Sequence, residues 1–257
     1  MLRLVTIPIS HFCEKARWAL DRAGIPYREE RHVQLIHRLA ARRAGGGRTV
    51  PVLVTPEGAL GESDEILAWV DERTPPQERL FPSDAGERAE VEGLCRRLDE
   101  RLGPTGRRLI YIHMLRQRGL MVRFNNQGVP TWEARALRLT WPLAIREMKR
   151  QLGIGPGAED EAEAAVWREL DHVAELLGDG RGFLCGDRFG AADLTFAALA
   201  AALIVPPVYG VPLPQPDVLR PDTAALVERA RAHPAGAHAM RMFAEHRRAA
   251  VATQPIS

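Results

Sequence analysis

One stretch constrains the fold most, because it places a hydroxyl and a thiol where an apolar strand turns into a helix. It runs from Ile7 to Arg17 and reads Ile-Pro-Ile-Ser-His-Phe-Cys-Glu-Lys-Ala-Arg. Residues 2–9 are apolar and partly β-branched, which predicts a strand. Residues 13–23 carry alanine and leucine at helical spacing, followed by a Gly-Ile-Pro stop. Such a turn directs backbone N–H groups and the positive end of the helix dipole outward, so it can hold a thiolate or another anion.

The two reactive side chains at this turn also have plain structural explanations. Ser10 has the residue type that caps a helix N-terminus, and Cys13 could be a small buried core residue. Taken alone, the stretch leaves both interpretations open.

A second feature is Val50-Pro51, which follows the glycine-rich loop 45–49 and leads into the apolar residues 52–54. A proline just inside a strand cannot donate to a sheet, so it marks an edge, a bulge or a cis turn. A cis bond would leave the N–H and C=O of Val50 available to an extended peptide ligand.

A third feature is the acidic start of a helix predicted to run to about Arg73. Glu62, Ser63 and Asp64 crowd its first turn, where acidic residues suit the helix dipole and simple capping would explain them. Alternatively, Ser63 and nearby N–H groups bind a carboxylate, while Glu62 or Asp64 binds an ammonium. The order of the three features, on a β-α-β then β-β-α pattern within 75 residues, is specific.

In this order the features resemble the thioredoxin-fold domain of the cytosolic glutathione transferases. Ser10 matches the first residue of that family's Ser/Cys-Pro-Phe motif, with Phe12 two residues on and Arg17 in the first helix. Val50-Pro51 matches the family's Val/Ile-cis-Pro element, and Glu62-Ser63 matches its Glu-Ser pair. The chain departs from the motif at His11, where a proline is usual, and its first tyrosine, Tyr27, comes too late for a tyrosine mechanism.

The resemblance implies a glutathione site built from these motifs. Val50-Pro51 would pair by its backbone with the cysteinyl part of glutathione, and Phe12 would belong to the same site. Glu62-Ser63 would hold the γ-glutamyl end, and His37 or Arg48 would bind the glycyl carboxylate. The resemblance also implies a homodimer.

Composition excludes several other classes of protein. The chain has 257 residues, a net charge of only +2 and 46% hydrophobic residues, which indicates a globular protein and favours neither nucleic acid nor a membrane as partner. Cys13, Cys95 and Cys185 are odd in number and widely spaced, so neither a disulfide framework nor a metal site is expected. No apolar run is long enough to span a bilayer and no signal peptide is recognisable, so a cytoplasmic location is expected.

A proline-rich hinge near residues 74–84 predicts two domains. Residues 1–75 would form an α/β thioredoxin-like glutathione-binding domain, and residues 85–257 an all-α domain with the second-substrate pocket. Helices are expected over residues 86–102, about 105–118 after a Gly-Pro-Thr-Gly interruption at 103–106, 132–152, 159–177 and 194–205.

The helical part carries more material than the family minimum, at residues 125–158 and 205–222. These segments could shape a second-substrate pocket or decorate the surface. Since family members bind the electrophile between the strand–helix turn and the helix after the linker, the pocket residues expected are Tyr111, His113 and Met114.

The function predicted is that of a glutathione transferase. Ser10 would donate a hydrogen bond to the glutathione thiolate, which then attacks a small apolar electrophile; no metal is involved. Two alternatives stay open: a glutathione-dependent thiol oxidoreductase or peroxidase using Cys13, and a non-catalytic protein that binds glutathione or an apolar ligand. Isomerisation with glutathione as cofactor is not separated from conjugation.

Overall fold

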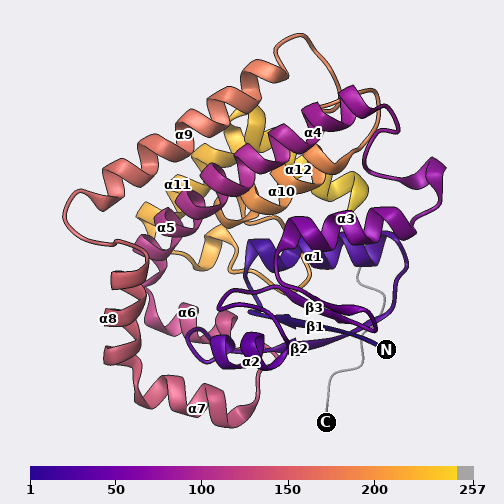
Figure 1. The fold of residues 1–257 in the computed structure, drawn as a ribbon. Helices are drawn as coiled ribbons and strands as arrows, with labels where there is room; N and C mark the ends of the chain where they lie inside the picture. The colour runs from indigo at the N-terminus through magenta and orange to yellow at the C-terminus, as the bar shows by residue number, and fades with distance from the viewer. Residues whose placement is uncertain (248–257) are drawn as a thin grey trace.

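The computed structural model describes residues 1–247 (Figure 1). Its N-terminal part follows the expected β-α-β then β-β-α order, with a further short helix before the second strand pair. The elements are β1 (Leu2–Thr6), α1 (His11–Arg22), β2 (Tyr27–Arg31), α2 (His37–Arg43), β3 (Val52–Thr55), β4 (Gly58–Leu60) and α3 (Ser63–Arg73). The first strand is shorter than predicted, because the chain leaves the sheet at Thr6 and turns before Ser10.

The four strands form one mixed sheet in the order β2-β1-β3-β4. β1 pairs with β2 in parallel and with β3 antiparallel, and Leu4 lies opposite Leu53. Because side chains alternate between the faces of a sheet, these two leucines point to the face covered by α1 and α3. Val5 and Val52 point to the other face, where they pack with α2.

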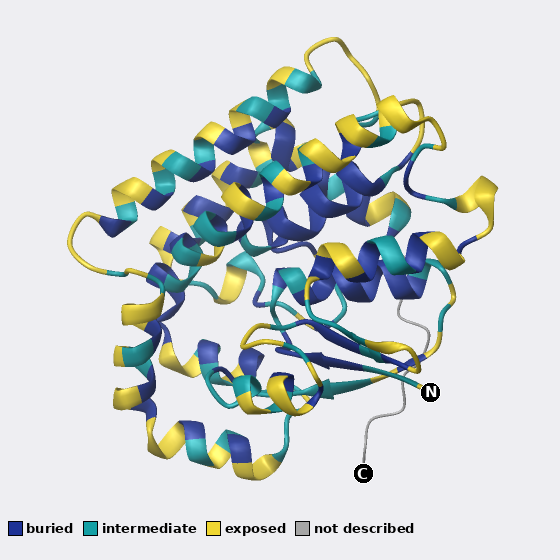
Figure 2. Cartoon of the chain, in the orientation of Figure 1, coloured by how far each residue is buried: buried dark blue, intermediate teal, exposed yellow. Residues whose placement is uncertain are grey.

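The C-terminal part is helical, as predicted. After a 3-10 turn η1 (Pro76–Glu78) come α4 (Ala85–Arg97), α5 (Gly103–Met114), α6 (Arg118–Asn125), α7 (Thr131–Leu139), α8 (Trp141–Gln151), α9 (Ala158–Leu176), α10 (Ala191–Ile204), the 3-10 turn η3 (Pro216–Val218), α11 (Pro221–Ala232) and α12 (Pro234–His246). α10 is apolar all round and lies at the centre of this part, with nearly every residue buried (Figure 2). The Asp193 carboxylate accepts the N–H of Gly190 at 3.1 Å, which is half of a capping box at the start of α10.

Two helix predictions were wrong, and each involves a proline. The expected interruption at 103–106 does not occur, because a π-helical turn η2 (Leu98–Leu102) leads directly from α4 into α5. Pro104 follows this turn, in which the N–H of Gly103 donates to the carbonyl of Leu98 five residues back, so the helix continues past the proline through a widened turn. The single helix expected over 132–152 is divided at Thr140, since Pro142 lies in the first turn of α8 and would break the hydrogen bonds of a continuous helix.

Candidate functional site

Ser10 occupies the N-cap of α1, at the turn that joins β1 to this helix. Its Oγ accepts the N–H of Cys13 at 3.4 Å, and its own backbone N–H donates to the carbonyl of Ile7 at 3.2 Å. A hydroxyl can accept and donate at once, so capping α1 does not use the hydrogen of Ser10, and the Cys13 thiol is one neighbour that can accept it. The turn therefore presents one O–H donor beside the positive end of α1.

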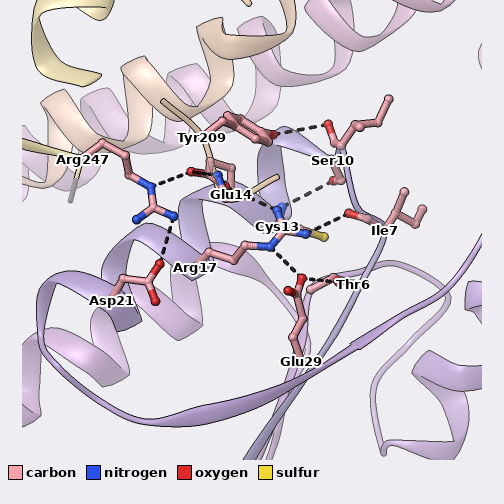
Figure 3. A network of polar contacts seen from close by, with 12 residues as sticks. Thr6, Ile7, Ser10, Cys13, Glu14, Arg17, Asp21, Glu29, Tyr209 and Arg247 are labelled. Carbon is pink, nitrogen blue, oxygen red and sulfur yellow. Dashed lines mark hydrogen bonds and ion pairs between the residues drawn. The ribbon is translucent and has the colours of Figure 1, made fainter. Parts of the chain in front are cut away.

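Buried side chains donate hydrogen bonds to the backbone carbonyls of this turn (Figure 3). Arg17 Nη2 donates to the Ile7 carbonyl at 3.2 Å, and the Tyr209 hydroxyl donates to the Ile9 carbonyl at 3.3 Å. Arg17 Nε also pairs with Glu29 Oε1 at 2.7 Å. Burial alone would raise the pKa of Glu29, but the charges of Arg17 and Arg31 outweigh it and hold that pKa at about 2. Glu29 is therefore a stable counterion for Arg17.

A second group of buried charges ties distant segments to α1 (Figure 3). Both carboxylate oxygens of Glu14 accept the N–H of Gly210, at 3.1 and 3.0 Å. Arg247 Nε lies 2.7 Å from Glu14 Oε1, and its Nη2 lies 2.9 Å from Asp21 Oδ2. The loop after α10 and the residue that follows α12 are thus joined to the first helix by charged hydrogen bonds.

A cavity of about 410 Å³ opens beside Ser10. Its walls come from the β1–α1 turn, the start of α2, the loop before β3, and helices α5, α8 and α10. The two additional segments noted in the sequence both contribute, through Met148 on α8 and Leu152 directly after it, and through Tyr209 and Leu213 in the loop after α10. These segments therefore shape the cavity.

The structure brings half of the expected site residues to this cavity. Those on its wall are Ser10, His37, Arg48, Val50, Tyr111 and Met114. The Val50-Pro51 bond is cis, and β3 begins two residues later at Val52. Glu62 lies at the edge of the cavity, since its Oε1 accepts the hydroxyl of Thr49, a wall residue, at 3.3 Å. Ser63 is the first residue of α3 and is buried.

The other six expected residues do not line the wall: Phe12, Cys13, Pro51, Glu62, Ser63 and His113. Cys13 is 0% exposed inside α1, and burial raises the pKa of its thiol. The ring of Phe12 packs against Gly103, where an added Cβ would lie 2.4 Å from Phe12 Cζ. His113 faces α9 and α11, with Nδ1 3.3 Å from Thr223 Oγ1 and Nε2 3.3 Å from Glu159 Oε1.

The wall residues that were not singled out as site residues from the sequence include His11, Arg38, Arg107 and Tyr209. The signal for Arg107 was present, since it precedes Tyr111 by four residues and Met114 by seven, a spacing that places all three on one helix face. Tyr209 carries no such signal, because it comes from a loop 200 residues beyond Ile9.

His11 and His37 are both neutral in this cavity. Burial, assisted by the charge of Arg107, lowers the pKa of His11 to about 3. Burial also lowers the pKa of His37 to about 4, with Arg38 and Arg107 adding to the effect. His11 is 4% exposed, and its Nε2 is buried without a hydrogen-bond partner among residues 1–247.

Comparison with known families identifies this arrangement. The N-terminal domain of glutathione S-transferase matches residues 4–78, and the C-terminal domain of glutathione S-transferase matches residues 156–231. The chain belongs to the glutathione S-transferase family. A search of curated proteins finds no match to it.

Solved glutathione S-transferase structures share the fold across nearly the whole chain. A structure from Xanthobacter autotrophicus Py2 has a TM-score of 0.60 at 19% identity, over 95% of this chain and 93% of that one. A structure from Methylobacillus flagellatus KT with glutathione bound has a TM-score of 0.61 at 16% identity, over 95% of each chain. A structure from Methylobacterium radiotolerans JCM 2831 in complex with glutathione sulfonate has a TM-score of 0.51 at 20% identity, over 100% of this chain and 97% of that one.

No helix within residues 1–247 is both long and apolar enough to cross a membrane. In the same part of the chain, no three His, Cys, Asp or Glu side chains are grouped so that they could hold a metal ion.

Proposed function

We propose that this protein is a glutathione transferase in which Ser10 activates the thiol of bound glutathione. The observation that carries the proposal is that Ser10 caps α1 on the wall of a largely apolar cavity, where its hydroxyl can donate a hydrogen bond. Membership of the family, and the relatives solved with glutathione or its sulfonate, support glutathione as the co-substrate.

The chemistry follows from the pKa of a thiol, which is near 8.5 when free. A hydrogen bond from Ser10 and the positive end of α1 both favour the thiolate, so a larger fraction of bound glutathione is nucleophilic at neutral pH. Ser10 remains a neutral donor throughout and needs no base. The thiolate sulfur then forms a bond to the electrophilic carbon, and the leaving group departs with the electron pair.

The proposed mechanism also implies which residues bind the parts of glutathione. We infer that Val50 binds the cysteinyl backbone, and that Glu62-Ser63, beside the wall residue Thr49, receives the γ-glutamyl end. The glycyl carboxylate would pair with Arg48 and Arg38. Burial and then repulsion by Arg48 lower the pKa of Arg38, and neither arginine forms an ion pair within residues 1–247, so an anion between them relieves the repulsion.

The test is the ultraviolet absorbance of the glutathione thiolate, titrated against pH with wild type, Ser10→Ala and Ser10→Gly. The wild type should lower the pKa of bound glutathione below that of free glutathione. Both variants should raise it by about one to two units, because a hydrogen bond to a charged group is worth about 1.5–3 kcal/mol. Glycine retains most of the helix cap, so a shift shared by both variants reports the missing hydroxyl.

Three other outcomes would contradict the Ser10 mechanism or favour another function. An unshifted thiol pKa in the wild type would overturn the Ser10 mechanism. Iodoacetamide labelling of native Cys13, with activity retained in Ser10→Ala, would then favour the thiol oxidoreductase. Binding of glutathione without any turnover would favour a non-catalytic role.

We also propose a homodimer in the cytoplasm, with residues 1–75 holding glutathione and residues 85–257 supplying the electrophile pocket. Sedimentation equilibrium measures the assembly directly. A monomer at micromolar concentration would refute that part of the proposal.

A further inference from the structure

The charge on the cavity wall has a single sign. Among the described residues that line it there are three arginines, Arg38, Arg48 and Arg107, and no aspartate or glutamate. His11 and His37 add no charge, since burial lowers the pKa of these imidazoles to about 3 and about 4. The rest of the wall is mainly aliphatic, with Ile110, Leu152 and Leu213 as examples. An apolar cavity with only cationic groups favours ligands that are apolar and negatively charged.

Arg107 is set apart from the arginines that surround it in the sequence. Arg108 Nη2 lies 3.2 Å from Glu161 Oε2, and Arg116 Nη2 lies 2.6 Å from Glu159 Oε2. Both of those carboxylates belong to α9. Arg107 lies on the face of α5 that borders the cavity and forms no ion pair within residues 1–247.

Arg107 differs from the other two wall arginines in the part of the chain that carries it, and its Cζ lies 5.9 Å from the centroid of the Phe12 ring. Arg38 and Arg48 lie on the thioredoxin-like side, where the glycyl carboxylate is proposed to bind. Arg107 lies on the helical side, on the same helix face as Tyr111 and Met114, which line the cavity with it. Its charge is therefore available to the second substrate.

We propose that the electrophile is an amphipathic anion, an apolar body carrying a carboxylate that pairs with Arg107. This inference rests on the proposed transferase function. The planar guanidinium presents two parallel N–H groups that match the two oxygens of a carboxylate. The apolar body would lie against Ile110, Tyr111 and Leu213, with its reactive carbon directed toward Ser10 and the sulfur.

A matched pair of electrophiles tests the charge alone: para-(chloromethyl)benzoate and its methyl ester. In both, the thiolate sulfur forms a bond to the benzylic carbon while the carbon–chlorine bond breaks and chloride leaves with the electron pair. The proton of the glutathione thiol goes to solvent. Only the carboxylate can pair with Arg107.

The readout is the ratio of kcat/KM for the carboxylate to kcat/KM for the ester. The wild type should favour the carboxylate, and Arg107→Gln should lower the ratio by about tenfold, as expected for a charged hydrogen bond from an exposed guanidinium. Arg107→Lys should fall between them, because it keeps the charge and loses the fork. Arg108→Gln, on the neighbouring position of the same helix, should leave the ratio unchanged.

A binding measurement separates this inference from the proposed function. Titration calorimetry with unreactive para-methylbenzoate, in the presence of S-methylglutathione, should show weaker binding to Arg107→Gln by a similar factor. If para-methylbenzoate binding depends on Arg107 but neither electrophile is turned over, the transferase function is refuted while the anion site is supported. An unchanged ratio in Arg107→Gln, or a ratio lost only in Arg48→Gln, would overturn the anion site.

Discussion

At the scale of single residues, His11 links the site to the stability of the whole chain. Its pKa of about 3 lies well below the ordinary value of 6.5, mainly because it is buried. The unfolded chain therefore binds a proton at His11 at a higher pH than the folded chain does. The stability that neutral His11 contributes is fully present above about pH 6.5 and is lost as the pH falls toward 3.

The expected result concerns the variant His11→Phe, which keeps a ring and removes the titration. Between about pH 6.5 and pH 4, wild type should lose up to about 1.4 kcal/mol of unfolding free energy per pH unit more than the variant does. Urea unfolding at several pH values measures both slopes, with neutral pH as the internal reference. Parallel slopes would show that His11 takes up its proton at the same pH in the folded chain as in the unfolded chain.

The residue scale also shows how far sequence patterns reach into the site. The strand–helix turn placed Ser10 correctly at the start of α1, since N-cap preference and apolar periodicity are local. Tyr209 was not predicted, although its hydroxyl lies 3.3 Å from the Ile9 carbonyl. That contact joins residues 200 positions apart, and no spacing along the chain encodes it.

At the scale of elements, the loop between α10 and α11 depends on one glycine. The N–H of Gly210 donates to both oxygens of Glu14, and a Cβ on Gly210 would lie 2.5 Å from Glu14 Oε2 and 2.7 Å from Arg17 Cδ. No side chain fits there unless the loop moves away from α1 or the side chains of Glu14 and Arg17 shift. The loop also carries Tyr209, so its movement would change the wall of the cavity.

We expect Gly210→Ala to lower the unfolding free energy by about 1–3 kcal/mol, through overpacking and a weakened charged hydrogen bond. It should also raise KM for the electrophile more than KM for glutathione, because the loop lines the helical side. Gly119→Ala on α6 is the matched control, since nothing lies within 4 Å of its added Cβ. Equal effects of the two substitutions on stability would contradict the close approach.

Elements were predicted well where the signal is local, and less well where two signals compete. The order of strands and helices in the first 75 residues follows from period-2 and period-3.6 patterns with clear stops. Pro104 was interpreted as a break although it begins α5, and the break at Pro142 was missed. Proline is favourable only in the first turn of a helix, so its meaning depends on where the preceding helix ends.

At the scale of the whole molecule, one apolar core joins the sheet to the helices. It runs from Leu4 and Leu53 of the sheet through α1 to α10 and α12. Trp18 lies at this junction and is 0% exposed; its ring centroid is 4.6 Å from that of Phe243, and its Nε1 donates to the carbonyl of His246 at 3.2 Å. A sequence pattern shows that α1 has a buried face, but it does not show that this face meets a helix 228 residues later.

Because the two parts share this core, we expect them to unfold together. Tryptophan fluorescence and far-ultraviolet circular dichroism should report one coincident urea transition for the wild type.

Trp18→Ala should lower the unfolding free energy by about 3–5 kcal/mol, since it opens a cavity and removes the bond to His246. Trp132→Ala on α7, where the side chain is 61% exposed, should stay within about 0.5 kcal/mol of wild type. Separate transitions in the wild type would mean that the sheet and the helices fold independently.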